Sequence, residues 1–224
     1  MSFMRRSSRA SSEKDRGAVM VEAIVILPLL ILLVLGISEF GFIFRSTITI
    51  ASTSRSAARV SSNVANDRGA DYETLNTVIA SLGSSSIDLN DVEHVLIYNS
   101  TLEDDVPANC FSGGVPQASN STGRECNHYD TADLISLASD PTAAATFGLN
   151  TDGTPINPTA TACVIGDADF DFCPLDRDRT PNPNTEYVGV WIQVRHDFTT
   201  GVLPWNGITL EDKTVMGIEP VGTL

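Results

Sequence analysis

Five aspartates lie within one short segment, GDADFDFCPLDRD at residues 166–178. Their carboxylates could supply oxygen ligands to a cation. Carboxylates at positions 1, 3, 5 and 12 are the pattern of a calcium loop. Counted from Asp167, those positions hold Asp167, Asp169, Asp171 and Asp178. The sixth position is Phe172, however, where such a loop needs glycine for its turn, and Pro174 interrupts the segment. We therefore expect either a calcium site at these four aspartates or, more simply, a solvated acidic loop.

The same aspartates could hold Mg²⁺ for phosphoryl or glycosyl transfer. Those chemistries need a cradle for phosphate, and the sequence has no Gly-rich phosphate loop. His94, His128 and His196 do not have the spacing of a metal-binding motif, and a catalytic triad cannot be assigned from residue order. The sequence therefore predicts that this protein is not an enzyme and has no cofactor, calcium being the one ion to consider.

The four cysteines, Cys110, Cys126, Cys163 and Cys173, favour two disulfides, because an even number on the outer side of a membrane commonly pairs. Three pairings are possible, and we favour the nearest neighbours, Cys110–Cys126 and Cys163–Cys173. Free thiols are the alternative. No CxxC spacing occurs, which argues against zinc.

The first 44 residues predict a membrane-spanning helix and its orientation. Residues 1–17 form a Ser-rich leader with five basic and two acidic residues, and residues 18–44 are apolar except for Glu22 and Glu39. As a helix this apolar run spans about 40 Å, enough to cross a bilayer. It is longer than the apolar core of a secretory signal and lacks a small-x-small cleavage site. We therefore predict a single-pass anchor with its N-terminus inside.

Three residues inside the apolar run would shape the membrane helix. Pro28 removes one backbone donor, so we expect a kink or local unwinding there. Gly36 and Gly41 are soft points or sites of close helix packing. Residues 45–66 contain few helix breakers, so the helix should continue as a stem.

The remainder, residues 67–224, is predicted to be an extracytoplasmic α+β domain: a small antiparallel sheet packed on the stem. Strands are expected at 92–98, 187–196 and, more briefly, 214–219. A helix with Asp71 as its N-cap should end at Gly83, and another should cover 131–139. Residues 102–186 are predicted to be a loop-rich insert that the two disulfides cross-link.

The charge distribution argues against nucleic-acid binding. The whole chain has a formal charge of −14, and residues 18–224 alone hold nine basic and 26 acidic residues. A phosphate backbone is bound by basic surfaces, so no nucleic-acid partner is expected.

The junction between leader and apolar run resembles the processing site of type IV prepilins. Glu22 is the fifth residue after Gly17, and this resemblance implies cleavage between Gly17 and Ala18 by a membrane prepilin peptidase. The new amine of Ala18 could then pair with Glu22 of a neighbouring subunit, because a carboxylate within hydrocarbon is unfavourable unless paired. The alternative is that Glu22 belongs to an ordinary single-pass anchor, and that its side chain extends to the lipid headgroups.

A longer string is similar to the TadE-like family, the pilin-like minor components of the Tad (Flp, tight adherence) pilus. The matching elements are Arg16-Gly17, Val21-Glu22-Ala23, Pro28, Glu39 with Gly41, and Ala57-Ala58-Arg59. The resemblance implies a non-catalytic minor pilin or pseudopilin in the bacterial cytoplasmic membrane that takes part in pilus assembly and adhesion. Its expected partners are the prepilin peptidase, other pilin subunits, the Tad assembly platform and the lipid bilayer. The alternative is an uncleaved, membrane-anchored surface domain that binds an extracellular ligand.

Overall fold

A computed structural model describes residues 11–85, 87–100, 106–118, 125–179, 186–201 and 206–219, with side chains of the first helix from Val19 onward. The chain divides into two compact units. The anchor unit comprises Met1–Ile43 and Phe198–Asn206, and the domain unit comprises Phe44–Asp197 and Gly207–Leu224. The expected boundaries at residues 17, 44 and 66 are a functional division that these compact units do not test.

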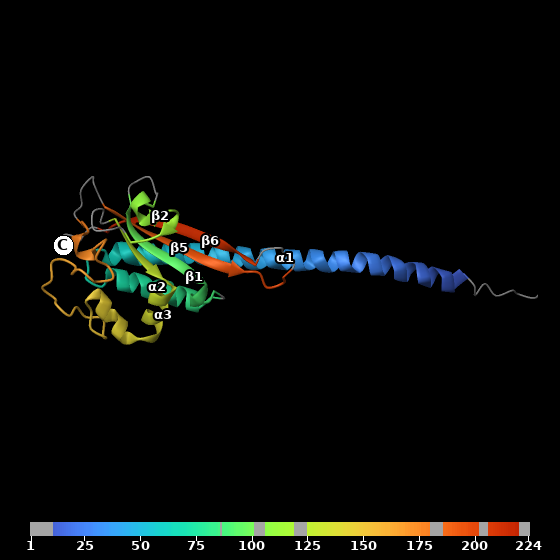
Figure 1. The fold of residues 1–224 in the computed structure, drawn as a ribbon, viewed down its shortest axis with the longest axis horizontal. Coiled ribbons are helices and arrows are strands. Elements are labelled where there is room, and N and C mark those ends of the chain that lie inside the picture. Colours follow the sequence, from blue (N-terminus) through green and yellow to red (C-terminus); the bar gives the residue numbers. More distant parts are fainter. Residues whose placement is uncertain are drawn as a thin grey trace, which may run out of the picture. The chain divides into compact units, whose positions relative to one another are not determined.

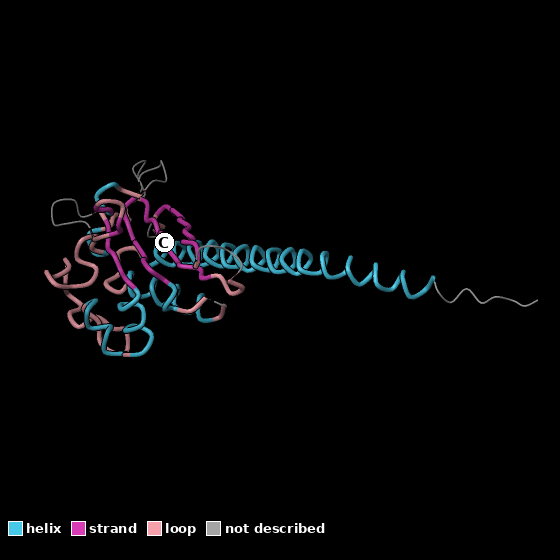
Figure 2. The backbone as a smooth tube through the Cα atoms, turned by 45° about the vertical axis from the view of Figure 1, so that its right-hand side comes forward, coloured by secondary structure: helices cyan, strands magenta, loops and turns pink. Residues whose placement is uncertain are grey.

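Helices and strands follow one another in a mixed order, as in an α+β protein. The α-helices are α1 (Ser11–Val64), α2 (Ala70–Gly83) and α3 (Thr131–Ser139). The strands are β1 (Val92–Ser100), β2 (Phe111–Ser112), β3 (Val115–Pro116), β4 (Cys126–Asp130), β5 (Tyr187–Asp197) and β6 (Gly207–Gly217). Short 3-10 turns lie at η1 (Leu89–Asp91), η2 (Ala108–Cys110), η3 (Pro141–Phe147) and η4 (Pro174–Asp176). Figure 2 distinguishes these helices, strands and loops by colour.

Four strands form one antiparallel sheet in the order β4-β1-β5-β6, and β2 pairs with β3 in a separate small hairpin. Alternation along β5 explains its central place: Val188, Val190, Ile192 and Val194 are buried on one face of the sheet. The α+β class, with a long N-terminal helix, a small antiparallel sheet and two disulfides, is therefore confirmed. Figure 1 shows β1, β5 and β6 lying side by side.

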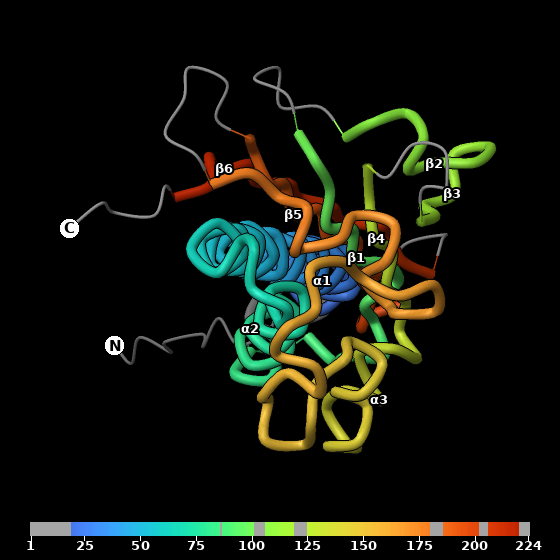
Figure 3. Tube along the Cα trace, turned by 90° about the vertical axis from the view of Figure 1, so that its left-hand side faces the viewer, coloured from blue at the N-terminus to red at the C-terminus, as the bar shows by residue number. Residues whose placement is uncertain are grey.

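The main core lies between the sheet and two helices. The inner face of the sheet packs against the stem part of α1 and against α2, and both helices lie on the same side of the sheet in the domain unit (Figure 3). The stem contributes small side chains, among them Ala57, Ala58 and Ala65, so the helix approaches the strands closely. The helix α1 ends at Val64, two residues before the expected end of the stem.

The other face of the sheet is partly covered by the segment around β2 and β3. Leu96, Tyr98 and Trp191 pack there with Cys110 and Cys126 into a second, smaller apolar cluster. The Phe111 ring meets the Trp191 ring edge-on at a centroid distance of 5.8 Å. The disulfide from Cys110 to Cys126 links this cover directly to β4.

Three local expectations need correction. Gly69 is the N-cap of α2, whereas Asp71 lies inside the helix. The Asp71 side chain is fully buried, and its carboxylate pairs with Arg177 instead of capping the helix. The last strand begins at Gly207 rather than at residue 214, since the whole length of β5 offers it a hydrogen-bonding edge. The insert at 102–186 is also more than loops, because it supplies the edge strand β4 and the buried ring of Phe147.

Candidate functional site: the exposed apolar helix and the acidic cluster

The N-terminal part of α1 exposes a run of apolar side chains that only Glu22 interrupts. Every residue from Val19 to Val34 is exposed, including large side chains such as Ile24 and Leu29, which are 70% and 68% exposed. Among the described residues, α1 is the one helix that is long and apolar enough to cross a membrane. Such a surface is stable in water only when something apolar covers it, so this helix fits a single-pass membrane anchor.

Glu22 lies on this exposed apolar helix. Within the part of the chain that the structure describes, its carboxylate has no hydrogen bond or ion pair. Gly17 and Ala18 belong to the same helix by backbone, and their processing stays a prediction. A carboxylate at such a position needs a partner from outside the subunit, because hydrocarbon does not solvate charge.

Pro28, Gly36 and Gly41 are compatible with a continuous helix. The α1 assignment continues across Pro28, so the expected local unwinding does not interrupt it. A Cβ atom placed on Gly36 or Gly41 would meet nothing within 4 Å. The fold of the single subunit therefore does not require glycine at either position.

Glu39 is the second carboxylate of the apolar run at residues 18–44, and it is only 1% exposed. Its Oε1 atom accepts hydrogen bonds from the backbone N–H of Thr200 at 3.1 Å and from the Thr200 hydroxyl at 3.3 Å. The segment after β5 therefore satisfies one oxygen of the Glu39 carboxylate, which the sequence marked only as part of the family pattern.

The cysteines form the two disulfides that the sequence favoured. Cys110 is bonded to Cys126 and Cys163 to Cys173, with Cα–Cα distances of 5.9 and 5.7 Å, and no free cysteine remains. The second bridge links Cys163, three residues before the aspartate-rich segment, to Cys173, the residue before η4, and thereby limits the conformations of that segment.

Two of the four calcium candidates lie beside one arginine. Asp167 pairs with Arg68, while Asp169 is fully buried with one oxygen 3.7 Å from the same guanidinium. The backbone N–H of Asp178 donates to Glu186, and no group of three or more acidic, His or Cys side chains suited to a metal occurs among the described residues. Arg68 therefore lies beside the first two aspartates, and calcium binding by the four candidates stays a prediction.

A second ion pair lies deeper in the domain unit. Arg177 Nη2 donates to Asp71 Oδ1 at 2.6 Å, and both side chains are fully buried. The other oxygen of Asp71 accepts hydrogen bonds from Asn127 Nδ2 at 2.7 Å and from the Tyr129 hydroxyl at 3.0 Å. A buried charge is stable only with such partners, so this network joins α2, β4 and the segment that follows η4.

Burial and neighbouring carboxylates shift two pKa values in this network. Burial, and then the nearby charge of Asp71, raises the pKa of Asp169 to about 7. Burial and the same carboxylate raise the pKa of Tyr129 well above its ordinary value. The sequence did not identify this network, because Arg68, Asp71 and Arg177 show no distinctive spacing.

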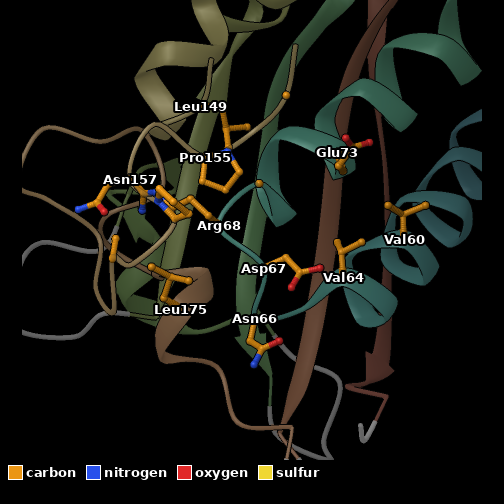
Figure 4. Close-up of a pocket in the computed structure, with 14 residues that line it drawn as sticks. Val60, Val64, Asn66, Asp67, Arg68, Glu73, Leu149, Pro155, Asn157 and Leu175 are labelled. Carbon is orange, nitrogen blue, oxygen red and sulfur yellow. The ribbon is translucent and has the colours of Figure 1, made fainter. Parts of the chain in front are cut away.

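A cavity of about 570 Å³ opens beside this cluster in the domain unit (Figure 4). Val60 and Val64 of the stem line one side, and Leu149 and Pro155 line another. Asp67, Arg68 and Glu73 add charged groups to its wall. Its size falls within the range of small-molecule sites, and its lining combines apolar surface with a few polar groups.

These observations define a class of protein: an α+β domain whose N-terminal helix fits a single-pass membrane anchor and exposes an apolar surface with an unpaired carboxylate. Residues 17–59 match the family described as TadE-like protein. The match confirms the resemblance over these residues, which include Glu22, Pro28, Glu39 and the Ala57-Ala58-Arg59 string, and it suggests association with a pilus system. Comparison with curated proteins and with solved structures gave no match.

Proposed function

We propose that this protein is a TadE-like minor pilin or pseudopilin that takes part in the assembly or priming of a Tad (Flp)-type pilus. The observation that carries the proposal is the exposed apolar helix with its unpaired Glu22, inside the segment 17–59 that matches the family. The role is structural and not catalytic. It serves a pilus that mediates adhesion and surface colonisation.

In this proposal a prepilin peptidase cleaves between Gly17 and Ala18 and removes the basic leader. The mature chain then begins with the cationic amine of Ala18, four residues before Glu22 on one helix face. The amine of one subunit pairs with the Glu22 carboxylate of another pilin subunit, which compensates both charges within the membrane. The absence of side chains at Gly36 and Gly41 permits close contact with a neighbouring helix.

The proposed location is the bacterial cytoplasmic membrane, with the N-terminus inside and the domain unit on the outer side, where disulfides are stable. The Tad assembly platform and other pilin subunits are the proposed partners, and the subunit can later enter the pilus at the cell surface. The formal charge of −17 over residues 18–224 supports the expectation that nucleic acid is not a partner.

Mass spectrometry of the chain purified from membranes tests the cleavage. Cells that contain the prepilin peptidase should yield a chain that begins at Ala18, and a Gly17→Leu variant should keep its leader. A chain that begins at Met1 in both cases would contradict the processing step.

Substitution of Glu22 tests the pairing. Glu22→Ala should insert into the membrane normally but lose pilus assembly, because the Ala18 amine loses its partner. Glu22→Asp, which keeps the charge, should retain part of the assembly. Electron microscopy of sheared pili, with immunoblots of the membrane fraction as the insertion control, measures both. Normal piliation in Glu22→Ala would contradict the pairing.

The cavity beside Arg68 favours one alternative function, an uncleaved surface domain that binds a small extracellular ligand. Val64→Trp would fill part of this cavity. If adhesion depends on that cavity while the chain keeps its leader, this alternative replaces the pilin proposal.

A further inference from the structure

All charged residues of the stem, residues 45–66, lie on its solvent-facing side. They are Arg45, Arg55 and Arg59, and all three are exposed. At about 100° per residue, their spacings of ten and four residues place them within roughly 80° of one another around the helix. The opposite side of the stem, with Ile50, Ala57 and Ser61, is buried against the domain. We call the three arginines the basic stripe.

The charges of the basic stripe are not neutralised within the subunit. The stem contains no Asp or Glu, so no arginine has an acidic neighbour one helical turn away. Within the described residues, none of the three arginines takes part in an ion pair or hydrogen bond. Three cations on one side of the helix therefore face outward on a domain that is otherwise strongly acidic.

The matching anionic surface lies on the domain unit itself. Residues 67–224 hold 24 acidic and only six basic residues. Four exposed aspartates lie together where η1 and β1 meet the end of β4 and the start of α3: Asp88, Asp91, Asp130 and Asp133. The Thr131 hydroxyl hydrogen-bonds to the carbonyl of Val92, and β1 pairs with β4 at His94 and Asp130, which holds the two pairs of aspartates near each other. We call these four aspartates the acidic edge.

Anionic lipid is a poor partner for the whole stripe. Along the helix axis Arg55 and Arg59 lie about 15 and 21 Å beyond Arg45, which itself follows the exposed apolar run directly. The potential of an anionic membrane surface decays over about 8 Å at physiological ionic strength. Lipid headgroups adjoining the apolar run could therefore bind Arg45 but not the two arginines farther along the stem.

We propose that the basic stripe binds the acidic edge of a second copy of this chain. The two surfaces are different parts of the same molecule, so the contact is heterologous, and repetition of it produces an open chain of subunits rather than a closed dimer. Charge complementarity of this kind sets the orientation and register of the contact. The inference extends beyond the proposed function and does not depend on cleavage after Gly17.

Photo-cross-linking of the full chain in native membranes tests the contact. The probe is benzoylphenylalanine in place of the exposed Ser56, which lies between Arg55 and Arg59. Ultraviolet light should yield a cross-linked dimer, and mass spectrometry should locate the adduct in residues 87–100 or 125–139. An adduct with lipid, with a different protein, or elsewhere on the second copy overturns the proposal.

Charge reversal identifies the partners. Arg55→Glu with Arg59→Glu should lower the dimer yield about fivefold or more. With the probe only in this variant, a second, differently tagged copy with Asp91→Lys and Asp133→Lys should restore the cross-link. These changes keep the N-cap residues Asp88 and Asp130 but remove the N3 carboxylate of each capping box. Because rescue requires folded chains, it separates lost contact from lost fold. Failure of the second copy to restore the dimer overturns the proposal.

Arg195→Glu is the matched control, because Arg195 is an exposed arginine on β5 and does not belong to the basic stripe. It should leave the dimer yield unchanged, and an equal loss in this variant would show a general charge effect and overturn the specific contact. The length of the mature N-terminus is measured separately, so failure of cleavage and failure of this contact remain distinguishable.

Discussion

Asp71 and Arg177 form an ion pair whose two side chains are completely enclosed. The charges attract each other strongly in this environment, but both have lost their water, so the pair adds little net stability over an apolar pair of the same volume. Removal of one partner is different, because it leaves an isolated charge in the interior. The importance of the pair therefore appears only when it is broken.

Arg177→Met should lower the free energy of unfolding by about 3–5 kcal/mol. The Met side chain fills part of the space but leaves Asp71 without its cation, and the guanidinium that lies 4.1 Å from the Phe172 ring centroid is lost as well. Urea unfolding of the full chain in detergent, followed by tryptophan fluorescence, measures the change.

The matched control is Arg195→Met, since Arg195 and its partner Asp197 are 50% and 68% exposed. This exposed pair should contribute no more than about 1 kcal/mol. Equal losses from the two variants would contradict the role given to the buried pair.

Asp169 should make stability depend on pH between about 4 and 7. Its pKa is about 7 in the folded chain and near 3.8 when exposed. Between these values the folded state holds a proton that the unfolded state has released, so the contribution of Asp169 to stability is full below pH 4 and is lost as the pH rises to 7.

Asp169→Asn should remove this dependence, because the amide resembles the protonated carboxyl and does not titrate. The difference in unfolding free energy between variant and wild type should therefore grow in favour of the variant from pH 4 to pH 7. Measuring this difference cancels other groups that titrate in the same range, such as His128, whose pKa is lowered chiefly by burial. A constant difference over the range would contradict the proposed titration.

At the scale of elements, the contact between β1 and β5 depends on one glycine. A Cβ atom on Gly189 would lie 2.2 Å from Cζ of Tyr98, the residue that faces it on β1. Tyr98 is fully buried, so its ring has little room to move. The missing side chain of Gly189 is therefore what allows the large ring to lie across the neighbouring strand.

Gly189→Ala should destabilise the domain by about 1–3 kcal/mol, the range typical of overpacking in a core. Gly83→Ala at the end of α2 is the control, because a Cβ there would meet nothing within 4 Å. Thermal unfolding by circular dichroism should show a lower midpoint only for the first variant. An unchanged midpoint in Gly189→Ala would mean that the Tyr98 ring can shift without loss.

The strand β6 shows why one element was poorly predicted. Its central residues, Glu211, Asp212 and Lys213, are charged and lack the alternation of a half-buried strand. The strand forms because β5 pairs with it along its full length, and because Asp212 accepts a hydrogen bond from Ser54 of the stem. Pairing with a strong neighbour overrides weak local preference.

At the scale of the whole molecule, two short disulfide loops hold the insert between β1 and β5. Their cysteines are separated by 16 and 10 residues. Each bridge restricts the unfolded chain, and the longer loop is restricted more. The first bridge also joins the cover of the outer sheet face to an edge strand.

Cys110→Ser with Cys126→Ser should lower stability by about 2–4 kcal/mol, and Cys163→Ser with Cys173→Ser by a similar or slightly smaller amount. The first pair should also weaken packing around Trp191, since both cysteines belong to its apolar cluster. Urea midpoints of the two variants measure stability, and near-ultraviolet circular dichroism reports on Trp191. A native Trp191 signal in the first variant would contradict the prediction that this disulfide supports the packing around Trp191.

Sequence alone determined the features that depend on local pattern. The apolar run of α1 and the alternation of β5 identified an anchor and a central strand, and α3 was predicted with its observed bounds. Each of these elements has an apolar pattern of its own. The period or length of that pattern can be read from the sequence without knowing which elements pack against it. The family resemblance lies in the same local region.

Only the tertiary structure decided which charges are buried. Asp71 and Arg177 are 106 positions apart, and Asp167 is 99 positions from its partner Arg68. A charge enters the interior only where folding brings a partner of opposite sign to it, and local sequence does not encode that meeting. The pattern of residues therefore located the apolar helix, whereas long-range packing determined which aspartates pair with Arg68 and Arg177.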